Sequence, residues 1–176
     1  MLTGKEDRKG ICKNGDNSLI FTFEQGYDGS TLKPMTIKGI ITNSGVAAGK
    51  IANNKKYGVY IYEYGTPPTG DNMGNIFNPS GGTPGVTDGS DPNSPPNANR
   101  RDGDLKAYPT EDISNPVVLK YTDNQLTLFG SNSIAGRGLA VHAAVANPTD
   151  DFGGTAKILT CNIVLCDTTT CLSIDN

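Results

Sequence analysis

The sequence is poor in the residue types that most catalytic metal centres use. Its 176 residues include a single histidine, His142, and no tryptophan, and aromatic residues make up only 7%. A site that needs several imidazoles therefore cannot be built from this chain. The formal net charge is −3 and no basic patch is present, which argues against a nucleic-acid partner.

Long apolar segments and helix-forming stretches are lacking as well. No apolar run approaches the roughly 18 residues that a membrane-spanning helix needs, so we expect no membrane span. Glycine and proline account for 33 of the 176 residues, and both disfavour helices, which excludes a helical bundle. A chain of this length is typical of one domain, and we expect residues 1–176 to form a single unit.

The sequence does contain a series of short segments in which apolar and polar residues alternate. Alternation with period two is typical of half-buried strands. Turn-forming residues separate the segments, which predicts an all-β, antiparallel sandwich or barrel of about eight strands with long loops. The predicted strands are residues 11–12, 18–25, 36–42, 59–64, 117–121, 125–129, 138–145 and 158–165.

Two segments stand apart from this pattern. Residues 65–116 interrupt the strands, and within them residues 81–99 are almost entirely Gly, Pro, Asn, Asp, Ser and Thr. Such a composition cannot form a core, so we expect a flexible loop there. Residues 1–14 form a charged, glycine-containing lead into the first strand, and they are a candidate N-terminal arm for exchange between chains.

The four cysteines favour disulfides over a zinc site. Only Cys166 and Cys171 lie close together, and this spacing without a second pair is a poor zinc signature. Cys12 and Cys161 complete an even set, for which three pairings exist; the short spacing predicts a Cys166–Cys171 bridge. Disulfides are typical of oxidising compartments. We therefore expect an extracellular protein whose leader is absent from this numbering, in preference to a cytoplasmic one.

Several motifs, taken in chain order, resemble those of one family. They are Phe21-Thr22-Phe23-Glu24-Gln25, Phe77-Asn78-Pro79, Gly103-Asp104-Leu105, Gly136-Arg137-Gly138-Leu139-Ala140-Val141-His142 and Cys161-Asn162-Ile163-Val164. Over residues 19–165 the sequence resembles the copper/zinc superoxide dismutase family, and the Gly-Arg…His motif is the most specific match. The resemblance implies an eight-stranded Greek-key barrel with two long outer loops. It also implies that the first and last strands are neighbours, and hence a Cys12–Cys161 disulfide.

Most of the family's metal ligands are nevertheless replaced. The resemblance implies a copper held by four imidazoles and a zinc that shares one of them, yet only His142, at a copper position, and Asp104, at a zinc position, match. The family's active-site arginine corresponds to Ile158, and its loop cysteine to Asp71. One imidazole and one carboxylate from different metals cannot hold copper, so we expect no catalytic residue, no metal and no cofactor. The other ligand positions hold Tyr60, Tyr62, Ile76, Pro84 and Arg101.

Each matching residue has a structural and a functional interpretation. His142 is either a strand histidine whose ring finds a nearby carbonyl or tyrosine, or a metal ligand. Asp104 is either a loop carboxylate that accepts backbone N–H bonds, or a ligand. Arg137 is expected to make structural hydrogen bonds, with Asp104 or Glu63 as its candidate carboxylate partner.

Three tyrosines alternate along one predicted strand and are therefore expected to share a face of it. On the resemblance, Tyr60, Tyr62 and Tyr64 lie where the metals would be. The rings either fill this space as a small outer core or present an aromatic surface to a partner or a sugar. Because their hydroxyls can bind loop backbone, we expect residues 72–79 to be ordered over Tyr60 and Tyr62.

Function follows from these replacements. The leading interpretation is a non-enzymatic barrel, an extracellular structural or interaction module that self-associates as a homo-oligomer or filament, with Tyr60, Tyr62, Tyr64 and Arg137 as interaction candidates. Two alternatives stay open. One is a divergent metal-binding protein or dismutase that uses His142 and Asp104 with tyrosine ligands, and the other is a carbohydrate-binding module.

Overall fold

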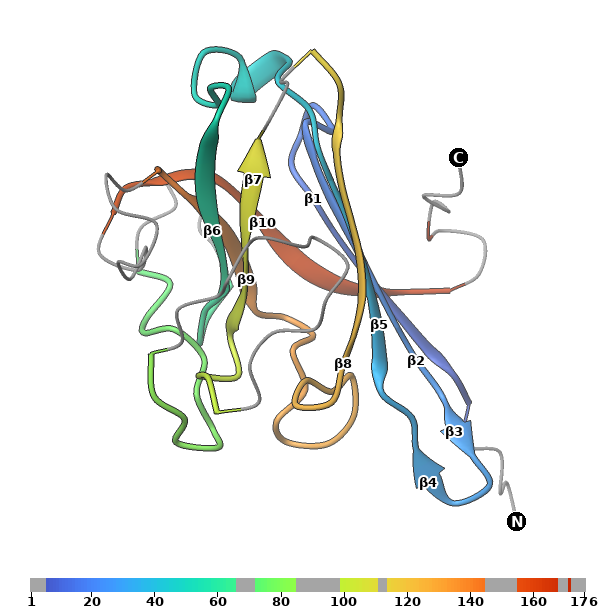
Figure 1. Ribbon diagram of the computed structural model, residues 1–176. Coiled ribbons are helices and arrows are strands. Elements are labelled where there is room, and N and C mark those ends of the chain that lie inside the picture. Colours follow the sequence, from blue (N-terminus) through green and yellow to red (C-terminus); the bar gives the residue numbers. More distant parts are fainter. Residues whose placement is uncertain are drawn as a thin grey trace.

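In the described residues the regular secondary structure is almost entirely antiparallel β-strand (Figure 1). The structure is a computed structural model, and it describes residues 6–65, 72–84, 99–110, 114–144, 155–167 and 171. One short 3-10 helix, η1 (Gly45–Ala47), follows β5, and no helix in these ranges is long and apolar enough to cross a membrane. The strands are β1 (Arg8–Lys13), β2 (Leu19–Gln25), β3 (Tyr27–Asp28), β4 (Thr31–Leu32), β5 (Met35–Ile41), β6 (Lys55–Ile61), β7 (Asp104–Thr110), β8 (Val117–Asp123), β9 (Gly138–His142) and β10 (Lys157–Cys166).

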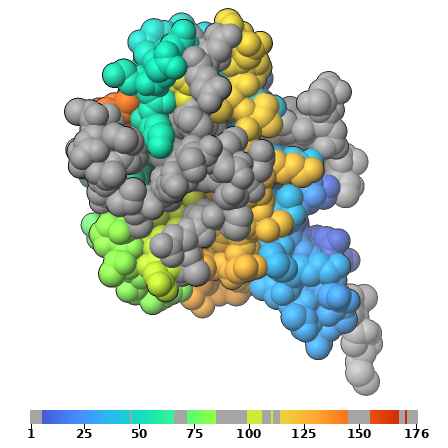
Figure 2. Space-filling model, viewed as in Figure 1, coloured from blue at the N-terminus to red at the C-terminus, as the bar shows by residue number. Residues whose placement is uncertain are grey.

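Eight of these strands form one continuous sheet in the order β7-β6-β9-β10-β1-β2-β5-β8. The sheet curls so that β1, β2, β5 and β8 lie opposite β6, β7, β9 and β10 (Figure 1). The pairs β1–β10, β6–β9 and β5–β8 join strands that are distant in the chain, which is a Greek-key arrangement. The predicted all-β, eight-stranded antiparallel Greek-key fold is therefore confirmed. The β3–β4 hairpin forms a separate small sheet that extends beyond the barrel (Figures 1 and 2).

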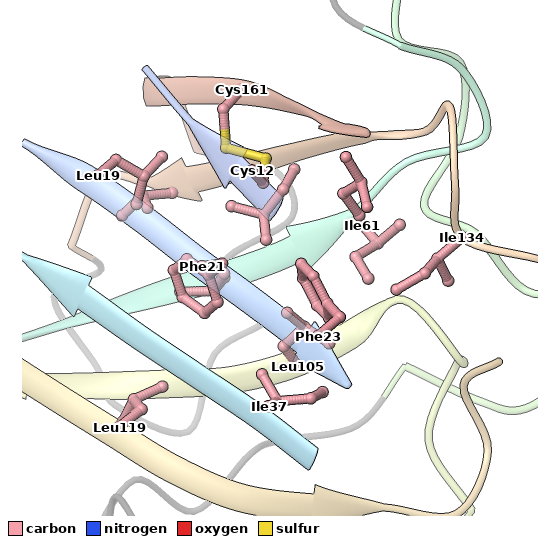
Figure 3. Packing of buried hydrophobic residues seen from close by; sticks show 14 of the residues in the cluster. Cys12, Leu19, Phe21, Phe23, Ile37, Ile61, Leu105, Leu119, Ile134 and Cys161 are labelled. Carbon is pink, nitrogen blue, oxygen red and sulfur yellow. A yellow bond between two sulfur atoms is a disulfide. The ribbon is translucent and has the colours of Figure 1, made fainter. Parts of the chain in front are cut away.

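Side-chain alternation explains why these segments form a barrel. In β2 and β5 every second residue is buried, which places one apolar row of each strand inside. Phe21 and Phe23 of β2 stack at a centroid distance of 6.3 Å in the middle of the core (Figure 3). Ile61, Leu105 and Ile134 reach the same core from the other half of the barrel and from a loop. Burial of such side chains stabilises the fold by about 1.5–3 kcal/mol each.

Two sequence-based assignments are wrong in detail. Residues 125–129 were expected to form a strand, but polar side chains take their backbone N–H groups: Asp123 accepts those of Gln125 and Leu126, and Gln25 accepts that of Leu128. Conversely, β7 lies inside the interruption expected to be loop. It contains Pro109 and forms an edge of the sheet, where a missing N–H is tolerated.

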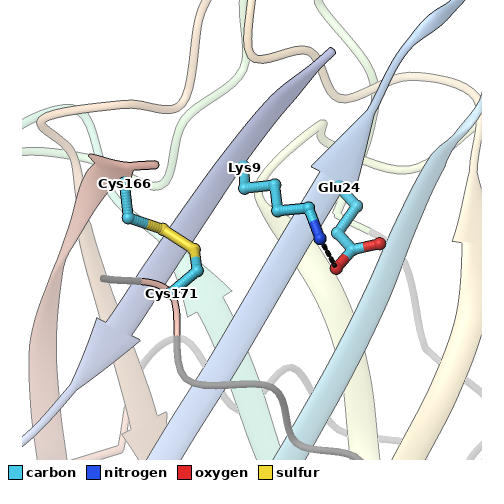
Figure 4. Close-up of a disulfide and its surroundings, with 4 residues drawn as sticks. All are labelled: Lys9, Glu24, Cys166 and Cys171. Carbon is cyan, nitrogen blue, oxygen red and sulfur yellow. Dashed lines mark hydrogen bonds and ion pairs between the residues drawn. A yellow bond between two sulfur atoms is a disulfide. The ribbon is translucent and has the colours of Figure 1, made fainter. Parts of the chain in front are cut away.

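Both predicted disulfides are present. Cys12–Cys161 joins β1 to β10 in the core (Figure 3), with Cα atoms 5.4 Å apart. Cys166–Cys171 closes the chain beyond β10, near the Lys9–Glu24 ion pair on β1 and β2 (Figure 4). The first bond therefore fastens the two halves of the sheet at their junction, and the second fastens the end of the last strand.

Two predicted segments are only partly described. Within the candidate arm, residues 1–14, the strand β1 is paired on both sides with its own chain, to β10 and to β2. Residues 1–5 of the arm and residues 85–98 of the expected flexible loop lie outside the described residues. Exchange of the arm and flexibility of the loop stay predictions.

We expect the two disulfides to differ in their contribution to stability. Cys12–Cys161 spans 149 residues and Cys166–Cys171 spans five. Because a longer closed loop restricts the unfolded chain more, replacing both cysteines of the first bond with alanine is expected to cost about 3–5 kcal/mol, and those of the second about 2 kcal/mol or less. Denaturant unfolding of both double variants measures the difference. Equal losses would contradict the loop-length argument.

Candidate metal-site region

The single histidine is held by a tyrosine from the neighbouring strand. His142, at the end of β9, is fully buried, and its Nε2 lies 2.6 Å from the hydroxyl of Tyr62 just beyond β6. The two rings are stacked, with centroids 5.9 Å apart and planes 8° from parallel. Tyr60 pairs with Ala140 between the antiparallel strands β6 and β9, and Tyr62 and His142 each lie two residues from this pair, so their side chains share its face of the sheet. A tyrosine is thus the partner of the histidine ring, as in the structural interpretation of His142.

Both ring nitrogens of His142 have a hydroxyl neighbour. Nε2 is hydrogen-bonded to the Tyr62 hydroxyl at 2.6 Å, and Nδ1 lies 3.4 Å from the hydroxyl of Thr155, which donates to the carbonyl of Ala143 at 2.9 Å. Which atom of the Tyr62–His142 bond donates depends on the tautomer of the ring. In either case Nε2 is engaged with a side chain of the protein.

A second, small core covers this pair. Tyr60 meets the His142 ring edge-on at a centroid distance of 5.0 Å, and it clusters with Tyr62, Met73 and Ala140, with Ile76 packed against them. The backbone of residues 73–77 is hydrogen-bonded to that of Ile61 and Tyr64, and Ile76 pairs with Tyr62 in an isolated bridge. Residues 72–79 are ordered over the two rings as predicted.

The expected tyrosine face is correct for only two of its three members. Tyr60 and Tyr62 are 3% and 4% exposed, whereas Tyr64 is 61% exposed. Beyond the end of β6 at Ile61, Tyr62 still pairs with Ile76 in an isolated bridge, whereas Tyr64 lies in the bend that follows and the strand alternation does not extend to it. The structure therefore places Tyr60 and Tyr62, two of the interaction candidates, in the outer core, where their side chains are almost fully buried.

The surviving aspartate is paired with an internal cation. Asp104 is fully buried at the start of β7, and both its oxygens accept hydrogen bonds from Nε of Arg101, at 2.9 and 3.1 Å. The Arg101 guanidinium also lies 5.9 Å from the ring centre of Tyr60. The carboxylate therefore has a side-chain counter-ion.

Arg137 makes the structural hydrogen bonds expected of it, and of its two candidate partners, Asp104 and Glu63, it contacts Glu63 through the backbone carbonyl. Its Nε donates to the carbonyl of Ser133 at 2.9 Å, and its Nη1 donates to the backbone carbonyl of Glu63 at 2.7 Å. The guanidinium lies 3.8 Å above the ring of Phe77. Burial lowers the pKa of Arg137, and the nearby carboxylate of Glu63 partly opposes this shift. Arg137 thus fastens the loop before β9 to the end of β6.

One buried ion pair was missed by sequence reasoning. Arg100, 2% exposed, pairs with Asp123 of β8, and its Nη1 donates to the carbonyls of Arg101 and Asp102. It thereby ties the segment before β7 to β8, the two edges of the sheet. No local motif links residues that are 23 positions apart, so the sequence carries no signal for this contact.

The comparisons with known proteins identify the class of this barrel. Residues 20–164 match the family model of copper/zinc superoxide dismutase. The chain is 33% identical over 144 residues to Cu-Zn superoxide dismutase 5 of Dictyostelium discoideum, covering 81% of this chain and 79% of that protein. It is 32% identical over 142 residues to a Cu-Zn superoxide dismutase of Talaromyces marneffei, covering 79% and 77%. The chain belongs to the copper/zinc superoxide dismutase family.

The residues at the family's ligand positions do not fit the two metals. A guanidinium has no lone pair to give, so Arg101 cannot be a ligand, and the side chain of Ile76 has no donor atom. The phenols of Tyr60 and Tyr62 are weak metal ligands unless deprotonated, and the one imidazole is hydrogen-bonded to Tyr62. Imidazole is the ligand that suits copper, and this chain offers one.

The hydrogen bond between Tyr62 and His142 can be tested by removing one atom. Tyr62→Phe keeps the ring stacking and is expected to cost about 1–2 kcal/mol, because a buried ring nitrogen loses this partner. Tyr62→Ala is expected to cost about 2–4 kcal/mol, because a cavity is added. Tyr64→Phe, at an exposed position, is the matched control and should stay within about 0.5 kcal/mol. A negligible cost for Tyr62→Phe in denaturant unfolding would contradict the assigned role.

The Arg101–Asp104 pair calls for a double-mutant cycle. Arg101→Met leaves a buried carboxylate without this counter-ion and is expected to cost about 2–4 kcal/mol. Adding Asp104→Asn to that variant removes the buried charge, so the double variant should lose clearly less than the sum of the single losses. Additive losses in thermal or denaturant unfolding would show that the two side chains do not depend on each other.

Proposed function

We propose that this chain is a non-catalytic member of its family, a barrel that serves as an extracellular structural or interaction module. One observation carries the proposal: side chains at lost ligand positions now bind the two ligand residues that remain. Tyr62 hydrogen-bonds His142, and Arg101 pairs with Asp104. Both remaining ligand residues thus have side-chain partners within the protein, and a copper ion at Nε2 of His142 would have to displace the Tyr62 hydroxyl.

The disulfides support the extracellular part of the proposal. All four cysteines are paired, in two bonds that join strands or close the chain end. Cytosolic thiols are generally kept reduced, whereas secreted domains retain such bonds.

Self-association through residues 1–14 belongs to the same proposal, and exchange of this arm would produce a disulfide between chains. In an exchanged assembly, β1 of one chain would lie between β10 and β2 of its neighbour. Cys12 would then bridge to Cys161 of that neighbour, because this bond joins β1 to β10. Linked chains on a non-reducing denaturing gel, with a matching mass by light scattering, would support exchange. A monomer in both measurements would remove it.

The proposal predicts that the purified chain does not dismutate superoxide above a protein blank after copper and zinc are supplied. The reason is the donor set, which offers copper one imidazole. Activity is measured together with copper and zinc content per chain, and His142→Ala is the control. Copper-dependent activity that His142→Ala abolishes would instead support a divergent dismutase.

A further inference from the structure

A solvent-open hollow of about 900 Å³ lies beside the second core, and its lining is richer in cations than in anions. Arg101, Arg137 and Lys157 line it, with Glu63 as the carboxylate among its lining residues. The carboxylate of Asp104 pairs with Arg101 and offsets its charge. Even with Asp104 counted, the cations exceed the anions in this region, although the whole chain has a net charge of −3. The hollow is therefore locally opposite in sign to the chain.

The side chains of Lys157 and Arg137 each lie over an aromatic ring. The Lys157 ammonium lies 4.7 Å from the ring centre of Tyr62, and the Arg137 guanidinium 3.8 Å from that of Phe77. Cations held in this way keep their charge while losing freedom, so less ordering is needed when an anion binds. Two of the rings, those of Tyr62 and Phe77, also line the hollow.

Lys157 and Arg137 have binding capacity left for an incoming group. Lys157 is exposed at the start of β10, and neither cation is ion-paired with another residue of the described part of the chain. Arg137 uses Nε and Nη1 for carbonyls, so donors remain on the guanidinium. Partial burial of this charge lowers the pKa of Arg137, which a bound anion would reverse.

The rest of the lining suits an organic body. Tyr64, 61% exposed, and Ile76 face the hollow beside the cations. Gly74, at a positive φ of 77°, lets the loop approach the Tyr64 ring, since a Cβ there would lie 2.7 Å from a ring carbon. An exposed aromatic beside two cations fits a ligand that carries both a negative head and a planar or apolar body.

We propose that this hollow binds a small organic oxyanion, with its carboxylate or phosphate held by Lys157 and Arg137 and its body against Tyr64. The inference extends the proposed function, because it gives the non-catalytic module a class of ligand. It does not depend on the absence of dismutase activity. The two are tested separately, since binding is measured on chelator-treated, disulfide-intact chain without added metal.

The test is a titration of the full chain at low salt with four probes, in which NMR or calorimetry measures binding. Phenyl phosphate and benzoate carry both an anionic head and an aromatic body. Inorganic phosphate carries the anionic head alone, and phenol carries the aromatic body alone. We expect one of the first two to bind several-fold more tightly than inorganic phosphate and phenol. Preference between them identifies the head group. Phenol binding as tightly as the charged probes would overturn the proposal, as would the absence of binding by all four.

Single variants locate the site. Lys157→Gln is expected to weaken binding of the preferred probe about five- to tenfold, the loss of one charge-assisted contact, and Lys157→Arg should retain it. Lys120→Gln, an exposed lysine of β8 in the other half of the barrel, is the matched control and should change nothing. Tyr64→Ala should weaken phenyl phosphate but not inorganic phosphate. Equal effects of Lys157→Gln and Lys120→Gln would overturn the assignment of the site.

Discussion

Two buried polar groups, the carboxylate of Asp104 and the imidazole of His142, impose the constraint on which this site depends. Both are fully buried, and a buried polar group that lacks a partner costs about 1–3 kcal/mol, more when it is charged. Arg101 gives Asp104 a cation, and Tyr62 gives His142 a hydroxyl. Tyr60 and the loop at 72–79 then pack over these pairs. The side chains of this region thus bind one another, and the loop at 72–79 packs over them.

Strict alternation made most of the fold predictable. In β2 and β5 the period of two identifies both the strand and its buried face, because a shift by one residue would expose the whole apolar row. The same rule failed at residues 125–129, where Gln25 and Asp123 take the backbone N–H groups that a strand would pair. It also missed β7, which contains a proline and lies within the long interruption between predicted strands, and whose place in the sheet comes from its pairing with β6.

The site was predictable only where the family motif fixes neighbours. The motif places His142 on a strand beside the one that carries Tyr60 and Tyr62, so their contact could be expected. Arg101 was expected only as a lost ligand, because its bond to Asp104 depends on a loop conformation that no pattern encodes. The hollow beside them was not foreseen, since Lys157 and Arg137 come from separate elements that only the folded barrel brings together.

The most direct test of this account is the unfolding midpoint of the same chain after chelation and after copper and zinc loading. A metal that binds the native barrel raises the midpoint by mass action, with a gain that grows with free metal. Side chains that already balance the site predict the same midpoint in both samples, within about 1 °C. A rise that increases with copper or zinc and disappears in His142→Ala would contradict the central claim.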